Sequence, residues 1–316
     1  MRKKNIRPKK TIKIIFFAIV NIVFFYILYL WIKRNIHIHE LLFAIKQSSL
    51  FSLLLCLLIS LFILVLYGKR LALLVVEPVK KAFPVVCIGF GLNNFIPFRL
   101  GDALRVYFAK KVYGFSITKM IVASFVEKYL DFLCVLICAL VLFFAKGAIV
   151  NEKMFYGALI LLVFMIVAAW ICGYFVFYEN KIKSYFVKYQ IVGKVVSALE
   201  NFFSNKNHSN IIGYTIAIWF CTWLVFYLYC KLNIHEHSFF WVDAFALVII
   251  TTASFAFPTV LAGIGVFESG MVFYLIKFVG LGPEQALALA LMLHLIICVP
   301  QMLLTGAIFL CKKTNE

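Results

Sequence analysis

Acidic residues are scarce in this chain. Among 316 residues there are 13 Asp and Glu against 31 Lys and Arg, so the formal net charge is +18. In a soluble protein this balance would suggest a nucleic-acid partner, but 65% of the residues are hydrophobic and the mean hydropathy is +1.02. Such a composition is typical of a polytopic membrane protein. We therefore attribute the positive charge to cytoplasmic loops and to contact with anionic lipid headgroups, and expect no nucleic acid.

Long polar blocks and known catalytic patterns are also missing. These residues leave no room for a cytoplasmic catalytic module of ordinary size. No Gly-rich phosphate loop with Lys-Ser/Thr, no Gly-x-Ser-x-Gly and no His-Glu-x-x-His is present. The nine Cys lie mostly inside apolar runs and form no Cys-x-x-Cys pair, so we expect buried small hydrophobes rather than a metal site. No catalytic residue, metal or cofactor is assigned, and movement or binding of a lipid is favoured over a reaction.

Apolar runs divide the chain and predict an all-α polytopic membrane protein. About six full transmembrane helices are expected, together with two re-entrant helix pairs that form an inverted repeat. The full spans are predicted at 14–32, 49–67, 117–144, 155–178, 211–230 and 286–310. With both termini in the cytoplasm, 23 Lys and Arg fall inside and seven outside, as the positive-inside rule requires. No small-residue cleavage site follows the first run, which is expected to stay as a span.

Two shorter apolar runs that end at prolines predict the re-entrant pairs. Residues 82–96 would cover about 22 Å as a helix, against a hydrocarbon core of about 30 Å. Pro97 and a polar turn follow this run. Residues 239–257 likewise stop at Pro258, before a Gly-containing turn. A broken helix at membrane depth is tolerated where its backbone lines a protected, wet cavity.

The two interrupted regions share an order of elements. Each reads as a short helix, a turn with one acid, a second short helix, a Gly and a long helix, and aligning Gly114 with Gly280 places Lys128 opposite His294. We interpret 1–316 as one integral membrane domain with repeat units at 82–131 and 239–300. The units are expected to enter the bilayer from opposite sides, a pattern that marks a transporter's binding site. The alternative is a chance placement of Pro and Gly.

The longest polar segment, 180–210, is expected on the cytoplasmic leaflet. Its apolar residues recur at three- to four-residue steps between lysines, which predicts an amphipathic helix. The alternative is a solvated connector.

Charged residues near the two turns form the candidate headgroup site. Glu127 and Asp131 share a helix face next to Lys128, and isolated charges there must face protein or water. Arg suits phosphate because its planar fork donates two hydrogen bonds. The predicted headgroup and phosphate ligands are Asn93, Asn94, Arg99, Asp102, Arg105, Glu127, Lys128, Asp131, Glu268 and His294. Lys128 is expected to pair with Asp131. Structural ion pairs, an interfacial anchor at Arg105 and a core histidine at His294 are the alternatives.

Three motifs occur together in this sequence: Asn94-x-x-Pro97-x-Arg99-x-Gly101-Asp102-x-x-Arg105, Glu127-Lys128-x-x-Asp131, and Pro258 with Gly263-x-Gly265-x-x-Glu268. In them the chain resembles the lysylphosphatidylglycerol synthase transmembrane-region family, also called the flippase-like domain family. The likeness covers nearly the whole chain. Asp102 and Lys128 stand where the family usually has Glu and Arg, and His294 stands where an Arg is common.

The resemblance implies re-entrant helices around a lipid-binding cavity in a bacterial or archaeal cytoplasmic membrane. Long members of the family move aminoacylated phosphatidylglycerol made by a separate soluble domain, which these residues lack. The first hypothesis is a lipid flippase that takes an anionic phospholipid or a lipid-linked substrate. The alternatives are a lipid-modifying transferase with Glu127 or Asp131 as general base, and a non-catalytic partner of a soluble glycosyltransferase or aminoacyltransferase. A homodimer is a further expectation.

Overall fold

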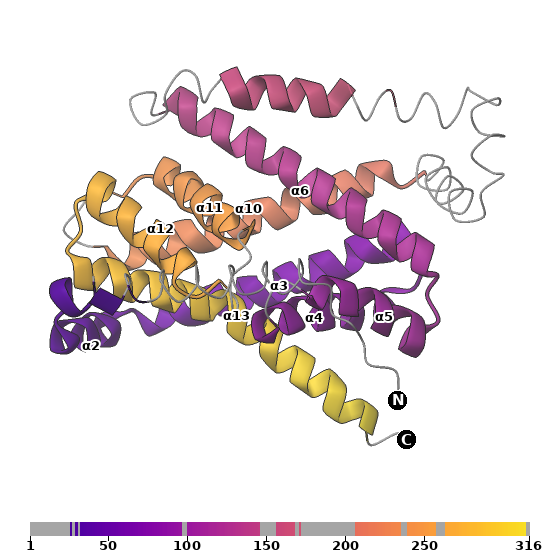
Figure 1. The fold of residues 1–316 in the computed structure, drawn as a ribbon, viewed down its shortest axis with the longest axis horizontal. Helices are drawn as coiled ribbons and strands as arrows, with labels where there is room; N and C mark the ends of the chain where they lie inside the picture. Colours follow the sequence, from indigo (N-terminus) through magenta and orange to yellow (C-terminus); the bar gives the residue numbers. More distant parts are fainter. Residues whose placement is uncertain are drawn as a thin grey trace, which may run out of the picture.

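The computed structural model describes residues 26, 29–30, 32–96, 100–145, 156–167, 171, 206–234, 239–256 and 263–313. These residues build an all-α membrane protein (Figure 1). Four of its helices are long and apolar enough to cross a bilayer: α3 (Leu50–Val75), α6 (Ile117–Ala145), α10 (His208–Asn233) and α13 (Pro283–Lys313). The predicted polytopic all-α class is therefore confirmed. The predicted span 14–32 and the segment 180–210 lie mostly outside the described residues. Of the predicted span 155–178, residues 156–167 and 171 are described, and 156–167 are helical.

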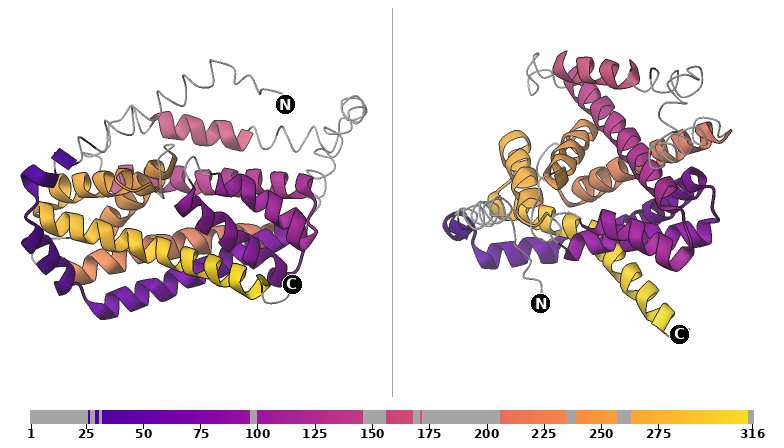
Figure 2. Two further views of the ribbon diagram at one scale, coloured as in Figure 1. Left: turned by 60° about the horizontal axis from the view of Figure 1, so that its bottom comes forward. Right: turned by 45° about the vertical axis from the view of Figure 1, so that its right-hand side comes forward.

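Shorter helices fill the predicted hairpins. The first hairpin is α4 (Val79–Phe95) followed by α5 (Gly101–Tyr113), and the second is α11 (Trp241–Ala256) followed by α12 (Val266–Tyr274) and a π-helical turn, η2 (Leu275–Val279). A further helix, α2 (Ile38–Gln47), precedes α3 and packs on α13. In Figure 1 the α4–α5 hairpin lies at the right and the α11–α12 hairpin at the left. Figure 2 shows the long helices running along the length of the body between them.

Local sequence explains where these helices begin and end. Ser49 caps α3, because its side chain accepts a hydrogen bond from the Ser52 backbone N–H at 3.3 Å. Pro78 precedes α4, and Pro283 opens α13, where the missing N–H of proline costs nothing. Gly114 ends the first hairpin with φ +75°, a left-handed conformation that favours glycine. These signals were visible in the sequence.

The same C-terminal cap closes both hairpins. The Phe115 N–H donates to the Ala109 carbonyl at 3.0 Å, and the Leu281 N–H donates to the Leu275 carbonyl at 3.1 Å. In each case the donor lies six positions after the acceptor. Gly280 has φ +86° and so matches Gly114. The alignment of these two glycines in the sequence therefore corresponds to a shared backbone feature.

Helix contacts are reciprocal between two four-helix units, α3–α4–α5–α6 and α10–α11–α12/η2–α13. The first helices of the units, α3 and α10, pack together; α4 packs on α13, and α11 packs on α6. The short helix of each unit therefore contacts the last long helix of the other. The units extend beyond the predicted bounds 82–131 and 239–300, since each includes the long helix before its hairpin. Their opposite orientation in a bilayer stays a prediction.

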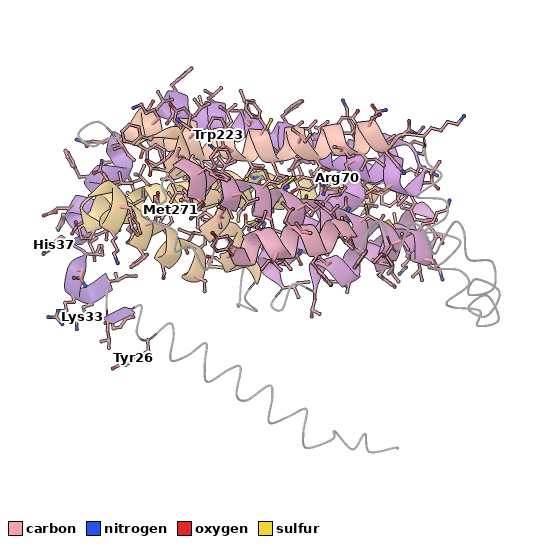
Figure 3. The ribbon with its side chains drawn as sticks, turned by 90° about the horizontal axis from the view of Figure 1, so that it is seen from above. Tyr26, Lys33, His37, Arg70, Trp223 and Met271 are labelled. Atoms are coloured by element: carbon pink, nitrogen blue, oxygen red, sulfur yellow. The ribbon has the colours of Figure 1, made fainter. Side chains whose placement is uncertain are left out.

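One predicted boundary is wrong. The span predicted at 49–67 was expected to end in the cytoplasm at Gly68, Lys69 and Arg70, but α3 continues to Val75 and Arg70 is fully buried. Figure 3 shows Arg70 among the helices, in the right-hand half of the body, with Met271 of the second hairpin in the left-hand half. The apolar residues after Arg70 keep the helix inside the bundle, so Arg70 does not count as a cytoplasmic loop charge.

A glycine face lets α4 approach its neighbours. An added Cβ at Gly91 would lie 2.8 Å from the Gln301 carbonyl oxygen on α13 and would also collide with the Thr305 side chain, which donates to the Cys87 carbonyl at 2.7 Å. Backbone cannot move aside as a flexible side chain can, so the close contact between the two units requires glycine here.

We expect Gly91→Ala to lower the free energy of unfolding by about 1–3 kcal/mol, the usual cost of overpacking a tight contact. The matched control is Gly213→Ala inside α10, where no heavy atom of the described residues lies within 4 Å of the added Cβ. The control should be neutral or stabilising by up to about 1 kcal/mol, because alanine favours a helix. Thermal unfolding of the purified proteins in detergent measures both, and equal midpoints for the two variants would contradict the packing described.

Candidate functional site

A cavity of about 600 Å³ lies where the two units meet. Its walls come from α3, α4, α5, α6, α10, α11 and α13, together with Ile96 and Gly263. Apolar and aromatic side chains, such as Phe90, Phe132 and Phe226, form much of the lining. The polar lining residues are Ser60, Arg70, Asn93, Asn94, Arg105, Glu127, Lys128, Asp131, Trp219, Thr222, Thr251, Thr252 and Gln301. A polar chamber among apolar helices is an arrangement that can hold a hydrophilic group inside a bilayer.

Arg70 is the central cation of this cavity, and the sequence analysis missed it. Its guanidinium forms a two-pronged pair with Asp131, at 2.7 Å from Nη1 and 3.1 Å from Nη2. Nη1 also donates to the Thr215 hydroxyl at 3.2 Å, and the guanidinium lies over the Tyr67 ring. The indole N–H of Trp219 donates to the same Asp131 carboxylate at 3.2 Å. Arg70 thus ties α3 to α6 and α10.

Arg105 and Glu127 form a second buried pair. Arg105 Nη1 donates to Glu127 Oε2 at 2.8 Å, and Nη2 lies 3.4 Å from Oε1. The stem of Arg105 passes across α4 at Gly89, where an added Cβ would lie 2.7 Å from Cδ. Arg70 Nε lies 3.9 Å from Glu127 Oε1, so the two pairs form one network. Glu127 therefore has Arg105 as its main partner.

The sequence predicted that Lys128 pairs with Asp131, but Lys128 pairs with Asp102 instead. The Lys128 Nζ–Asp102 Oδ2 distance is 3.7 Å, and Asp131 is occupied by Arg70. Because adjacent residues on a helix point in different directions, Lys128 turns toward α5 while Glu127 and Asp131 turn inward. Asn93 holds the other oxygen of Asp102 through its side-chain amide at 3.1 Å.

Asn94 links the first hairpin to the second unit. Its amide donates to the Gln301 side-chain oxygen of α13 at 3.0 Å, and its own oxygen accepts from the Cys298 thiol at 3.7 Å. Gln301 and Cys298 are therefore part of the cavity wall that the sequence analysis did not name. Gln301 directly follows Pro300 within an apolar run, and this position could have indicated its role from the sequence.

Glu268 and His294 form a buried pair outside the residues that line the cavity. Glu268 Oε1 lies 2.5 Å from His294 Nδ1, and Glu268 Oε2 accepts from the Gly265 N–H at 2.6 Å. Gly265 has φ +87°, and His294 stacks on Phe267 with ring centroids 4.5 Å apart. Glu268 lies on α12 and His294 on α13, and both side chains are held by protein groups. Their assignment to the headgroup site stays a prediction that the geometry does not favour.

The two acid–base pairs occupy matching places in their units. Asp102 and Lys128 are separated by 26 residues, and so are Glu268 and His294. Asp102 and Glu268 each stand in the first turn of the second hairpin helix, 12 residues before the glycine that ends the hairpin. The second pair is closed, with both side chains 7% exposed, whereas Lys128 and Asp102 are 54% and 38% exposed.

Most of the predicted site therefore comes together. Six of its members line the cavity: Asn93, Asn94, Arg105, Glu127, Lys128 and Asp131. Asp102 contacts two of them, and Arg99 lies outside the described residues. Within the described ranges, no three His, Cys, Asp or Glu side chains gather as a metal ion would require. The arrangement offers paired charges and amides that can hold a charged or polar ligand.

Comparison with known proteins identifies one family. Residues 15–305 match the family described as the lysylphosphatidylglycerol synthase TM region. Neither the curated proteins nor the solved structures contain a match to this chain. The family match covers the hairpins, both four-helix units and the cavity between them.

We expect Arg70→Gln to lower the free energy of unfolding by about 3–5 kcal/mol, because it leaves Asp131 as an uncompensated buried charge. The double variant Arg70→Gln with Asp131→Asn should recover much of that loss, since both charges are then gone. Lys69→Gln removes the neighbouring, partly exposed cation and serves as the control. Thermal unfolding in detergent measures the series. A double variant no more stable than Arg70→Gln would show that the pair does not act as described.

Proposed function

Because the chain belongs to the lysylphosphatidylglycerol synthase transmembrane-region family, we propose that it moves a phospholipid or lipid-linked headgroup between bilayer leaflets. The headgroup would pass through the polar cavity while the acyl chains stay in the bilayer. The observation that carries the proposal is the cavity itself, because three cations and two carboxylates line it among helices long enough to span. Charges at membrane depth are costly, and proteins keep them mainly where they serve a pathway.

The reciprocal packing of the two units supports a transport role. In the proposed arrangement both termini are cytoplasmic, the membrane is a bacterial or archaeal inner membrane, and the hairpins enter from opposite sides. When two units have opposite orientations in the bilayer, rocking one unit against the other can open the cavity first to one leaflet and then to the other. The contacts of α4 with α13 and of α11 with α6 are where such units would slide.

A lipid-modifying transferase is the second candidate. It would need Glu127 or Asp131 as a general base, but each carboxylate is engaged by an arginine at 2.7–2.8 Å. A carboxylate whose oxygens are both engaged by a guanidinium has little room to take a proton from a substrate. This geometry favours transport over catalysis. A role as partner of a soluble glycosyltransferase or aminoacyltransferase would use surfaces other than the cavity.

We expect filling the cavity to stop lipid exchange without disturbing the charge network. Ser60→Phe on α3 and Thr222→Phe on α10 each place a bulky ring in the cavity wall. In vesicles with fluorescent phospholipid in both leaflets, wild-type protein should let an external quencher reach the inner-leaflet label as it exchanges. Both filled variants should leave that label protected.

The matched control is Leu58→Phe, on the same helix as Ser60 but 65% exposed on the outer face. It should exchange lipid at the wild-type rate, because it leaves the cavity open. Wild-type rates in both filled variants, or wild-type vesicles no faster than protein-free ones, would refute the flippase proposal.

A further inference from the structure

We propose that Asp102 and Lys128 recognise the headgroup, and that they select one carrying both a phosphate and an ammonium group, with no net charge. This inference rests on the proposed function, since it assigns the class of lipid that the cavity binds. It departs from the expectation of an anionic phospholipid. It also moves phosphate recognition from the arginines to Lys128.

Protein carboxylates engage the terminal nitrogens of both arginines, whereas Nε of each has no hydrogen-bond partner among the described residues. Arg70 and Arg105 each direct both terminal nitrogens at a carboxylate, and their side chains are 0% and 7% exposed. Taking a carboxylate away from such a buried cation is strongly unfavourable. A lipid phosphate that displaced Glu127 or Asp131 would take the arginine from that acid. Asp131 would keep only the Trp219 N–H, and Glu127 only Arg70 Nε at 3.9 Å. The arginines therefore hold α3, α5 and α6 in place and set the shape of the site.

The Asp102–Lys128 pair is open to exchange. Its charged atoms are 3.7 Å apart, and 54% of the Lys128 side chain and 38% of the Asp102 side chain are exposed. Pairs of this kind contribute little to stability, so a ligand can separate them at small cost. Lys128 lines the cavity, and Asp102, which is not among the lining residues, lies beside the cavity through its contact with Lys128. The matching pair in the second unit, Glu268 with His294, is short and 7% exposed on both sides, so it offers no such opening.

Asp102 is positioned independently of Lys128. The Asn93 amide donates to Oδ1 of Asp102, while Lys128 faces Oδ2. When Lys128 turns to a ligand, Asp102 stays in place with Oδ2 free to accept from a second group. The pair therefore presents one fixed anion and one adaptable cation side by side, and a lysine ammonium binds phosphate well as a point charge.

Charge balance then sets the headgroup class. In the described part of the site, Arg70, Arg105 and Lys128 face Asp102, Glu127 and Asp131, so the charges cancel. A headgroup with phosphate and ammonium replaces one ion pair by two, Lys128 with phosphate and Asp102 with ammonium, and the sum stays zero. A purely anionic headgroup leaves Asp102 without a partner, and a net cationic one leaves an ammonium without a partner. At this partly exposed pair an unpaired charge has a modest cost, so we expect a preference of about tenfold rather than absolute selection.

The test measures which lipid the protein retains. Wild-type protein and three variants are reconstituted in bilayers of equal phosphatidylethanolamine and phosphatidylglycerol, extracted gently, and the bound lipid is quantified by mass spectrometry. The wild type should retain phosphatidylethanolamine in excess. Asp102→Asn, which leaves Lys128 uncompensated, should shift the bound ratio toward phosphatidylglycerol by roughly tenfold, the effect of one charge-assisted contact. Lys128→Gln should lower retention of both lipids, since each loses its phosphate partner.

Lys110→Gln is the matched control, because it removes an exposed cation from the same hairpin, outside the residues that line the cavity. It should keep the wild-type ratio. Equal retention of the two lipids by the wild type, a wild-type preference for phosphatidylglycerol, or an unchanged ratio in Asp102→Asn would overturn the inference.

This experiment is independent of transport because retention is measured at equilibrium. Lipid exchange between leaflets with no headgroup preference would remove the inference and leave the proposed function standing. The expected shift in Asp102→Asn without any exchange in wild-type vesicles would do the reverse.

Discussion

The pairing of Arg70 with Asp131 is the interaction on which the rest of this structure depends. A guanidinium buried near the C-terminal end of an apolar helix needs a carboxylate with matching geometry, and the two-pronged contact at 2.7 and 3.1 Å supplies it. Asp131 brings Glu127 onto the same face of α6, and Glu127 in turn receives Arg105 from α5. Helices of three different lengths are thus fixed around one charged network, and the cavity is the space that this network keeps open.

The second constraint is close approach of the two units. Gly91 lets α4 contact α13, and Asn94 with Gln301 closes the same boundary by a side-chain hydrogen bond. Because lipid tails are as apolar as leucine, helices in a bilayer gain little from hydrophobic burial against each other. Small residues and polar contacts therefore carry the association. They occur here at the boundary between the units, beside the cavity.

Much of this could be predicted from the sequence, and the failures share a cause. The helix breaks, the glycines that follow them and six of the residues that line the cavity followed from interrupted apolar runs and from charges placed inside them. Arg70 was missed because Gly68, Lys69 and Arg70 resemble the end of a span, and only tertiary contacts with Asp131 and Thr215 keep the helix going. The partner of Lys128 was wrong for a similar reason. Helical spacing favoured Asp131, but Arg70 occupies it, a competition that spacing alone does not reveal.

The path of the Arg105 side chain across Gly89 has a mechanical consequence. The aliphatic part of the Arg105 side chain crosses α4 at Gly89, and its guanidinium is held by Glu127. Arg105 therefore links α4 and α5 to each other and to the first half of α6. The hairpin can then only swing as a rigid lever. The backbone before α4 can act as its hinge, since Val76 has φ +57° ahead of Pro78. The surface on which the hairpin moves is then the contact of α4 with α13. Any widening of the chamber is thereby confined to the seam between the two units.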